Sequence, residues 1–333
     1  MISEGQLSSF YRAQDVLVTG GLGMIGSNLT HELVSLGARV RILDNLHPLY
    51  GGSEENVRDI RDRLDVQVGD IRDREAVGRA VTGCKVVFNL AAQVSYIDSY
   101  DMIYEDLAVN CEGHVNVLCA VRDRAPGCRV IFSGSRMQYG RILRPWPIDE
   151  SHACSPLTIY GVHKLAGESY HFVFRERAGV QAVSLRLANP YGIRHQRKHS
   201  KYGLVNFFIR KAAQGQALEV FGDGSQVRDY IYCSDTARAF LHAGATPEAD
   251  GEVFNIGSGL GTPFREMAET VVRTVGRGSV VSIPWPANYE RIETGDYVAD
   301  ISKARRTLGW EPKVSLEEGV RRIVEFDRAL LGL

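Results

Sequence analysis

The sequence predicts an α/β protein built on a doubly wound parallel sheet. Short apolar segments typical of buried strands alternate with helical segments through the first half of the chain. That order places helices on both faces of a parallel sheet. The first of these strands runs into a glycine-rich corner and then into a helix, which is how a nucleotide-binding βαβ unit begins.

The composition is that of a globular protein with a large core. The chain has 333 residues, 44% of them hydrophobic, and a formal net charge of -1, so it offers no bulk basic field to nucleic acid or to a membrane. No apolar run reaches transmembrane length, and the start carries no evident secretory signal. The six cysteines are scattered without a C-x-x-C pair, which predicts buried thiols in a reducing cytoplasm and no metal site.

Residues 16–37 form the glycine-rich corner. A strand over residues 16–19 leads into a turn with three regularly spaced glycines, Gly20, Gly23 and Gly26. Backbone N–H groups and the positive end of the following helix favour an anion, and glycine lets a phosphate approach closely. We therefore predict a dinucleotide pyrophosphate site here, with a plain strand-to-helix turn as the alternative.

The second strand, in ARVRILDNL, ends at Asp44. About twenty residues after the glycines, an acid at this point accepts hydrogen bonds from the adenosine ribose. Its charge would repel a 2′-phosphate, so Asp44 favours NAD over NADP. The alternative is a turn residue, because Asp-Asn is common in turns.

The following elements continue the alternation. They are a loop over 46–56, a third strand and turn over 65–73 with Asp70 in the turn, a helix from about Asp73, a fourth strand ending at Ala91 and Ala92, a helix over 106–122 and a fifth strand over 129–135. The two alanines would let a flat ring lie against the backbone, or would simply permit tight packing of strand and helix.

A tyrosine and a lysine carry the predicted chemistry. In YGVHK, Tyr160 and Lys164 lie one helical turn apart on one face. A nearby ammonium lowers the pKa of a phenol from about 10, and such a phenol can remove a proton from a sugar hydroxyl while hydride leaves the same carbon. Ser135, at the end of the fifth strand, would hydrogen-bond the same oxygen. A helix surface pair is the alternative for Tyr160 and Lys164.

An ordered set of motifs extends over nearly the whole chain: TGGLGMIG, LDNL, GDIRD, NLAAQVS, SGSRMQYG, YGVHK, LRLANPYG, FGDGSQVRDYIY, FNIGSG and ADISKARRTLGW. This set resembles the extended short-chain dehydrogenase/reductases, and more narrowly the NAD-dependent nucleotide-sugar epimerases and dehydratases of the UDP-glucose 4-epimerase type. The resemblance implies a Rossmann-type NAD-binding domain over residues 1–188 and about 230–258. It also implies a smaller, mixed α/β nucleotide-sugar-binding domain over 189–229 and 259–333.

The resemblance also implies roles for individual residues. Tyr160 would be the catalytic base, Lys164 would lower the pKa of Tyr160, and Ser135 would hydrogen-bond the same substrate oxygen through its hydroxyl. Asn110 would steady the catalytic helix. The cofactor contacts would be Gly20, Gly23, Met24, Ile25, Gly26, Asp44, Asn45, Asp70, Ile71, Leu90, Ala91, Ala92, Asn110, Tyr160 and Lys164.

On the substrate side, the resemblance implies contacts from Ser135, Arg136, Tyr160, Asn189, Arg228 and Arg291. Arg228 would clamp the nucleotide diphosphate, since a guanidinium suits phosphate oxygens; a structural pair with Asp229 is the alternative. Arg291 stands near the position of a second diphosphate-binding arginine of the family, although the family's usual Arg-Pro-Gly-Asp motif is missing. The basic residues in 195–202 would hold an anion or form a solvated loop.

Two departures from the family pattern narrow the reaction. The 4,6-dehydratases place an Asp-Glu pair directly after the residue equivalent to Ser135, whereas this chain has Arg136 and Met137. Elimination of water then lacks its acid and its base. Gly134, Asn89, Cys233 and Ser234 also depart from common residues, and we attach no change of chemistry to them.

We therefore predict an NAD-dependent epimerase of a nucleotide diphosphate sugar that inverts C4 through a transient 4-ketone. The alternatives are inversion at another carbon, as in CDP-tyvelose 2-epimerase, a keto-sugar reductase, and a non-catalytic NAD-binding sensor. The resemblance implies a cytoplasmic homodimer joined through the helix of Tyr160 and the helix over 106–122. Four apolar or small residues could form the dimer interface, or could instead pack against the sheet of their own subunit: Ala108, Val109, Val115 and Leu118.

Overall fold

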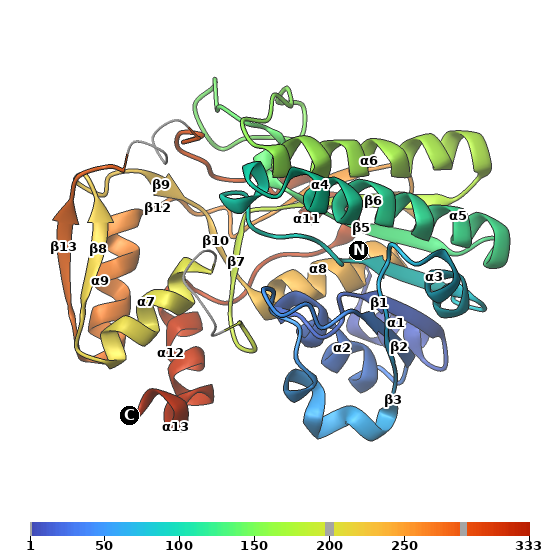
Figure 1. The fold of residues 1–333 in the computed structure, drawn as a ribbon, viewed down its shortest axis with the longest axis horizontal. Helices are drawn as coiled ribbons and strands as arrows, with labels where there is room; N and C mark the ends of the chain where they lie inside the picture. The colour runs from blue at the N-terminus through green and yellow to red at the C-terminus, as the bar shows by residue number, and fades with distance from the viewer. Residues whose placement is uncertain (1, 197–202, 287–291) are drawn as a thin grey trace.

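A seven-stranded sheet forms the centre of the computed structural model, which describes residues 2–196, 203–286 and 292–333. Its strand order is β11-β6-β5-β4-β1-β2-β3, and every neighbouring pair is parallel (Figure 1). The predicted doubly wound parallel sheet is confirmed. Its strands are β1 (Asp15–Thr19), β2 (Arg39–Asp44), β3 (Leu64–Val68), β4 (Val86–Asn89), β5 (Arg129–Ser135), β6 (Gln181–Leu187) and β11 (Val253–Ile256).

Helices cover both faces of this sheet because its strands are apolar on both sides. In β1, Val16 and Val18 pack into one core and Leu17 into the other. The first core includes α1 (Glu4–Tyr11), α2 (Met24–Ser35) and α8 (Cys233–Ala245). The second includes α3 (Arg74–Val81), α5 (His114–Arg124) and α6 (Ile159–Ala178).

The strand order reverses beside β1, since the chain runs outward through β2 and β3 and then returns to β4 on the other side. In such sheets, the crevice at the carboxyl ends of the two strands flanking the reversal binds ligands. The glycine corner follows β1, and residues 90–92 follow β4. Topology alone therefore brings these two predicted cofactor segments to one edge.

The smaller domain is a separate layer at the left of Figure 1. A two-stranded parallel sheet packs there with helices around a core of its own. Short strand pairs, β7 with β10 and β9 with β12, lie in the segments between the two domains. The elements are β7 (Asn189–Tyr191), α7 (Leu204–Ala213), β8 (Ala217–Phe221), β9 (Val227–Arg228), β10 (Tyr230–Tyr232), β12 (Thr262–Pro263), α9 (Phe264–Val275), β13 (Ser279–Ile283), α12 (Leu316–Phe326) and α13 (Arg328–Leu331).

Residues 297–310, which the predicted boundaries place in the smaller domain, pack into the core of the larger one. Tyr297, Ile301 and Leu308 are buried in the cluster that contains α8 and β11. The indole of Trp310 donates a hydrogen bond of 3.0 Å to the carbonyl of Asp235 in α8. This segment includes α11 (Ser302–Leu308), and it ties the end of the chain to both domains.

The single helix expected over 106–122 is interrupted. The chain forms α4 (Ile103–Leu107), then a π-helical turn over Ala108–Gly113, and then α5. A π turn adds a residue to one turn of helix and is frequent at functional sites. The other short helical turns are η1 (Glu54–Arg63), η2 (Asp98–Tyr100), η4 (Arg136–Gln138) and η5 (Pro247–Ala249).

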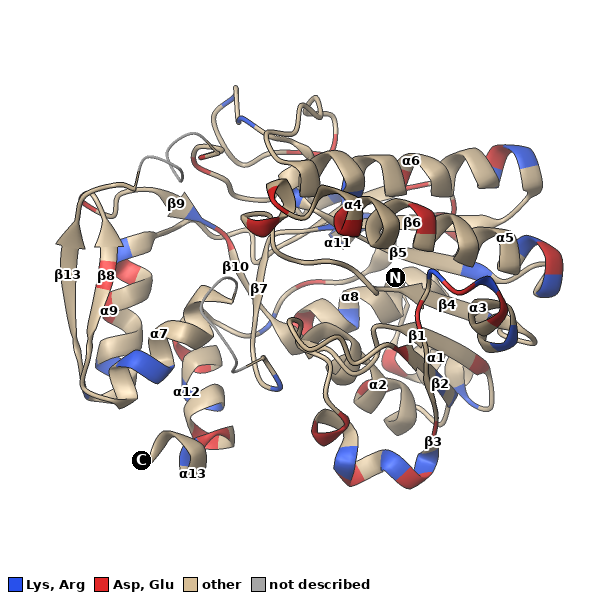
Figure 2. Ribbon diagram, viewed as in Figure 1, with Lys and Arg blue, Asp and Glu red and all other residues tan. Residues whose placement is uncertain are grey.

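Charged residues of both signs are spread over the outer helices and loops (Figure 2). Among the described helices, none has the length and apolar character needed to cross a bilayer.

Candidate active site

A cleft of about 670 Å³ lies between the two domains, where β1, β4, β5 and β6 end. The predicted site residues that line it are Gly20, Gly23, Met24, Ile25, Gly26, Leu90, Ala92, Ser135, Arg136, Tyr160, Lys164, Asn189 and Arg228. Those that the structure places behind or beside its wall are Asp44, Asn45, Asp70, Ile71, Ala91 and Asn110. Arg291 and residues 197–202 lie outside the described part of the chain.

The glycine corner forms a cradle that side chains would fill. A Cβ on Gly26 would come within 2.2 Å of the Gly20 carbonyl oxygen, and one on Gly20 within 2.9 Å of the Ala91 Cα. Gly20 also has a φ of +67°. Gly23 caps α2 without a side-chain hydrogen bond, so first-turn N–H groups of a twelve-residue helix remain available to an anion. This cradle fits a dinucleotide pyrophosphate.

Asp44 lies against the corner at the end of β2. Its Oδ2 accepts the Leu22 N–H at 3.0 Å and its Oδ1 accepts the Leu46 N–H at 2.9 Å. Burial raises the pKa of the carboxyl, while these two backbone hydrogen bonds lower it. Each carboxylate oxygen has a second lone pair, so hydrogen bonds from a ribose remain possible.

Asp70 is held in place by its neighbours. Burial raises the pKa of its carboxyl, but hydrogen bonds from Arg72 and Asn45 outweigh that effect and bring the pKa to about 2. The Arg72 guanidinium donates to both carboxylate oxygens, and Asn45 donates to Oδ2 at 2.7 Å. Ile71 is buried beneath the π-helical turn. This edge is fixed before any ligand binds.

Tyr160 and Lys164 face the cleft from the first turns of α6. Thr158 caps this helix by accepting the Gly161 N–H. Lys164 is 1% exposed, and its Nζ lies 4.7 Å from the centroid of the Phe132 ring. Burial lowers the pKa of Lys164 to about 8, while the charge of Asp106 acts in the opposite direction.

The pKa of Tyr160 moves opposite to the prediction in the protein alone. Burial raises it to about 12, with a hydrogen bond from Ser135 acting to lower it and the negative charge of Asp106 adding to the rise. A phenol removed from water ionises less readily. Formation of a tyrosinate therefore requires more positive charge than the protein supplies by itself.

The predicted Asn110 belongs to a buried polar cluster behind Lys164 whose other two members, Asp106 and His163, were not predicted as site residues. Oδ1 of Asp106 accepts hydrogen bonds from His163 at 2.6 Å and from Asn110 at 3.0 Å. Asn110 also donates to the carbonyl of Gln93. The second oxygen of Asp106 and Oδ1 of Asn110 are buried and accept no hydrogen bond from any residue in the described ranges. The only sequence signal was the position of His163 next to Lys164.

A buried ion pair fixes the next turn of α6. Glu168 accepts hydrogen bonds from the Arg186 guanidinium and, at 2.6 Å, from the Ser184 hydroxyl, both on β6. The Arg186 guanidinium also lies 4.8 Å from the ring centroid of Tyr139. Because Glu168 follows Lys164 by one turn, this pair anchors the helix that presents Tyr160.

Arg228 lines the cleft but is already paired. Its guanidinium donates to the Glu293 carboxylate and to two backbone carbonyls. The alternative pair with Asp229 does not form, since that carboxylate instead accepts the N–H groups of Ser258, Gly259 and Ala299. A ligand diphosphate would therefore compete with Glu293 for Arg228.

Arg136 and Met137 are both buried at the end of β5. Arg136 Nε donates to Asn189 Oδ1 at 3.1 Å and Nη1 to Thr294 Oγ1 at 3.0 Å. Asn189 in turn donates to the Asp229 carbonyl. This stretch therefore presents a cation to the cleft, where a water elimination would need carboxyl groups.

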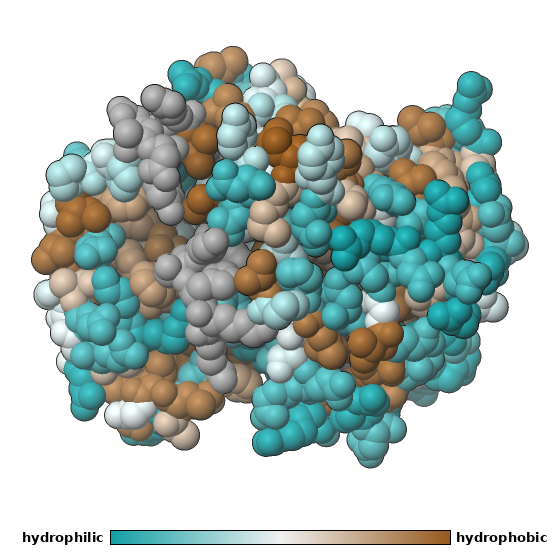
Figure 3. Space-filling model, viewed as in Figure 1, coloured by the Kyte–Doolittle hydropathy of each residue, from teal (hydrophilic) through white to brown (hydrophobic). Residues whose placement is uncertain are grey.

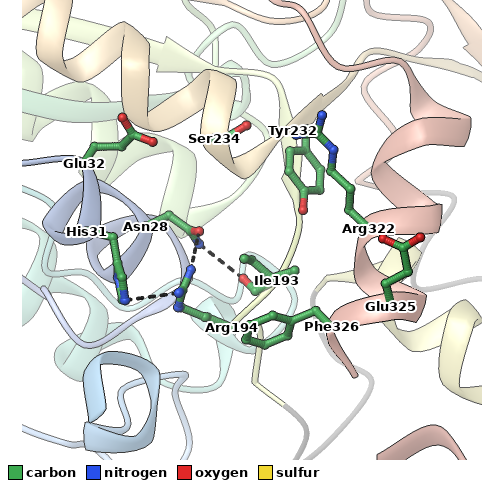
Figure 4. A pocket seen from close by; sticks show the side chains of 10 residues that line it. All are labelled: Asn28, His31, Glu32, Ile193, Arg194, Tyr232, Ser234, Arg322, Glu325 and Phe326. Atoms are coloured by element: carbon green, nitrogen blue, oxygen red, sulfur yellow. Dashed lines mark hydrogen bonds between the residues drawn. The ribbon is translucent and has the colours of Figure 1, made fainter. Parts of the chain in front are cut away.

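A second cavity, of about 520 Å³, lies between α2 and α12 (Figure 4). Arg194, whose φ is +64°, contacts Asn28 Oδ1 at 3.0 Å and His31 Nε2 at 3.1 Å. Its guanidinium also lies 5.4 Å from the ring centroid of Phe326. None of the residues predicted for the site is among its described lining, and Arg194 serves to tie the segment after β7 to both domains.

The fold and the cleft define a dinucleotide-binding α/β protein with a tyrosine–lysine pair at the site. Comparison with known proteins agrees. Residues 16–257 match the model of the NAD dependent epimerase/dehydratase family, and the chain belongs to this family. Its cofactor is NAD.

Relatives and solved structures align along nearly the whole chain. A UDP-glucose 4-epimerase of Mycolicibacterium smegmatis is 34% identical over 94% of this chain and 98% of its own. The UDP-glucose 4-epimerase of Thermotoga maritima, solved with UDP-glucose, has a TM-score of 0.85 at 33% identity, covering 96% of this chain and 100% of that one. The Thermus thermophilus UDP-glucose 4-epimerase, solved with NAD, has a TM-score of 0.83 at 30% identity, covering 95% and 99%.

Proposed function

We propose that the protein is an epimerase of a nucleotide diphosphate sugar and that it inverts C4. The observation that carries this proposal is the composition of one cleft. Tyr160, Lys164 and Ser135 share it with the glycine cradle, while Arg136 and Met137 stand where elimination would need an acid and a base. Relatives named UDP-glucose 4-epimerase support the same reaction class.

In the proposed reaction, Tyr160 takes the proton of the C4 hydroxyl and Ser135 holds that oxygen by a hydrogen bond. When bound, NAD supplies a hydride acceptor and, in its oxidised form, a positive charge that favours the tyrosinate. Lys164 keeps positive charge behind the phenol. The ketone then rotates within the cleft, so that hydride returns to the opposite face of the C4 carbonyl. Tyr160 gives its proton back to the C4 oxygen in the same step.

The proposal assigns the remaining residues to binding. The cradle at Gly20, Gly23 and Gly26 takes the NAD pyrophosphate, together with the N–H groups of Met24 and Ile25. The adenosine end and the ring contacts of the cofactor are assigned to Asp44, Asn45, Asp70, Ile71, Leu90, Ala91 and Ala92, with Asn110 behind Lys164. Asn189, Arg228 and Arg291 are assigned to the sugar nucleotide.

We also propose a cytoplasmic homodimer. Large apolar side chains are exposed on neighbouring elements at Tyr100, Ile103, Tyr104, Leu107, Val162, Tyr170 and Val173, and Figure 3 shows apolar side chains over α4 and the start of α6. Contiguous apolar surface of this kind marks interfaces. The seam residues named from the sequence need correction in part, because Val109 and Leu118 are buried in the core of their own subunit.

Incubation of the purified protein with UDP-, dTDP-, CDP- and GDP-sugars tests the reaction, with products identified by chromatography and NMR. We expect interconversion of two C4 epimers without net use of external NAD(H). A dehydrated keto-sugar, inversion at another carbon or stoichiometric oxidation of NAD(P)H would each exclude the proposal. NAD retained on the purified protein would separate an epimerase from a reductase, which must exchange its cofactor in every cycle.

A further inference from the structure

Arg136 carries a buried positive charge that the described part of the protein does not neutralise. The residue is 9% exposed. Within residues 2–196, 203–286 and 292–333, its guanidinium meets no carboxylate within ion-pair distance; its hydrogen-bond partners are the neutral side chains of Asn189 and Thr294. Burial lowers the pKa of Arg136, and the nearby charge of Arg228 lowers it further. An isolated buried charge is unfavourable.

The local charge count gives the same result. The charge of Glu293 acts to raise the pKa of Arg136, but its carboxylate bonds to Arg228 and to the Gly295 N–H. Among the described residues of this wall, two guanidinium groups thus share one carboxylate, which leaves one positive charge in excess. That excess favours an anionic group on the ligand.

The guanidinium is also held in a fixed orientation. One hydrogen bond comes from Nε and one from Nη1, and the Tyr297 ring lies 5.6 Å from the guanidinium carbon. Nη2 donates no hydrogen bond to any residue that the structure describes. A planar guanidinium fixed in this way presents its free N–H groups in the geometry that suits a carboxylate.

The position of Arg136 relates this charge to the sugar rather than to the nucleotide. It directly follows Ser135, which hydrogen-bonds to Tyr160, and all three residues line the same cleft. The smaller domain provides two further cations along the same cleft, Lys211 and Arg228. Each has a carboxylate beside it, Glu219 or Glu293, with which a diphosphate would compete.

We propose that Arg136 binds a carboxylate carried by the sugar, so that the substrate is a nucleotide diphosphate hexuronic acid. The C6 carboxylate of such a sugar is attached to the carbon next to C4, within reach of a group adjacent to Ser135. This inference rests on the proposed function, since it takes Tyr160 and Ser135 to mark the reacting carbon. It makes Arg136 a specificity-determining residue.

Equilibrium binding tests the inference independently of turnover. Isothermal titration of the NAD-loaded protein with UDP-glucuronate, UDP-glucose and UDP should give at least about tenfold tighter binding of the uronate than of the neutral sugar. Equal or weaker binding of UDP-glucuronate would overturn the inference even if the protein epimerises a neutral sugar. Absence of turnover with retained discrimination would instead count against the proposed reaction alone.

Variants separate the carboxylate from the diphosphate as the source of the anion. Arg136→Met should reduce the uronate preference about 10- to 100-fold, the range for hydrogen bonds between charged groups, and leave the affinity for UDP unchanged. Arg136→Lys, which keeps the charge, and Thr294→Val, which removes one orienting bond, should each lose less. Met137→Leu is the control.

An equal loss with UDP-glucuronate, UDP-glucose and UDP would show that Arg136 holds the diphosphate and would overturn the inference. The comparison with wild-type protein stands even if Arg136→Met does not fold.

Discussion

The Asp106 carboxylate accepts a 2.6 Å hydrogen bond from His163, the residue that precedes Lys164 on α6. This contact joins two segments far apart in sequence directly behind the proposed base. The charge of Asp106 raises the pKa of both Lys164 and Tyr160. The Asp106 carboxylate thus influences the protonation state of both Tyr160 and Lys164.

Asp106→Asn should therefore move the pH window of activity downward. Removing the negative charge lowers the pKa of Tyr160, which must lose its proton, and of Lys164, which must keep one. Both limbs of the pH profile of kcat/KM should shift to lower pH. The larger shift is expected on the alkaline limb, which follows Lys164, whose pKa is about 8 in the intact protein. An unshifted profile would show that Asp106 acts only in packing; Glu105→Gln, on the same helix, is the control.

Tyr160→Phe should reduce kcat by about 10²- to 10⁴-fold, the usual contribution of a positioned acid–base group. Nucleotide-sugar binding should persist, because the cleft keeps its shape. Stopped assays together with isothermal titration measure the two effects separately. Tyr170→Phe, a half-exposed tyrosine farther along α6, should leave both unchanged. Retained turnover in the Tyr160 variant would remove this residue from the mechanism.

Gly26→Ala should weaken NAD binding by more than about tenfold, since the added Cβ would lie 2.2 Å from the Gly20 carbonyl oxygen and relief of such a clash costs about 1–3 kcal/mol. The NAD content of the purified protein measures the effect. Gly5→Ala, at an exposed position of α1 where a Cβ would meet only the Ser3 hydroxyl oxygen at 3.9 Å, is the matched control. Full NAD occupancy in the Gly26 variant would contradict the cradle.

Glu168→Gln should lower the free energy of unfolding by about 3–5 kcal/mol, because it leaves Arg186 buried without its anion. Chemical denaturation followed by tryptophan fluorescence would give this value. The exposed pair of Arg58 with Glu55 provides the comparison, since Glu55→Gln should change stability by less than about 1 kcal/mol. Similar losses in the two variants would deny the buried pair its structural role.

Tyr104→Glu combined with Val173→Glu should convert the proposed dimer into a monomer. Both side chains are exposed, at 85% and 55%, and a charge on an apolar seam opposes association. Light scattering at micromolar concentration measures the mass. Leu260→Glu, at an apolar residue that is 67% exposed elsewhere, should not change it. A monomeric wild-type protein would rule out the interface at once.

Local pattern in the sequence predicted the sheet well. The strand expected over 129–135 is β5 (Arg129–Ser135), because the β-branched and aromatic residues at 130–132 and the small residues after them fit a short buried strand followed by a turn. The glycine corner and the pair on α6 were likewise readable, since their spacing is fixed within one turn and one helix. These features depend on neighbours in the chain.

The features of the site that the sequence did not predict depend on contacts between distant segments of the chain. The bond from His163 to Asp106 links positions 57 residues apart, and the pairing of Arg228 with Glu293 spans 65. The rise in the pKa of Tyr160 comes from burial by the assembled cleft, which no spacing of residues reveals. The excess charge at Arg136 likewise became visible only when its partners proved to be neutral.

The π-helical turn over Ala108–Gly113 sets the rotational phase between two surfaces. Each residue advances an α-helix by about 100°, so tightening this stretch to regular α-helix at unchanged length would turn α4 relative to α5 by about that angle. Asn110 could then no longer donate to the Gln93 carbonyl while Tyr104 remained exposed. A one-residue deletion here, which removes the extra residue and keeps the phase, should thus be better tolerated than a one-residue insertion, as a deep mutational scan that includes length changes would reveal.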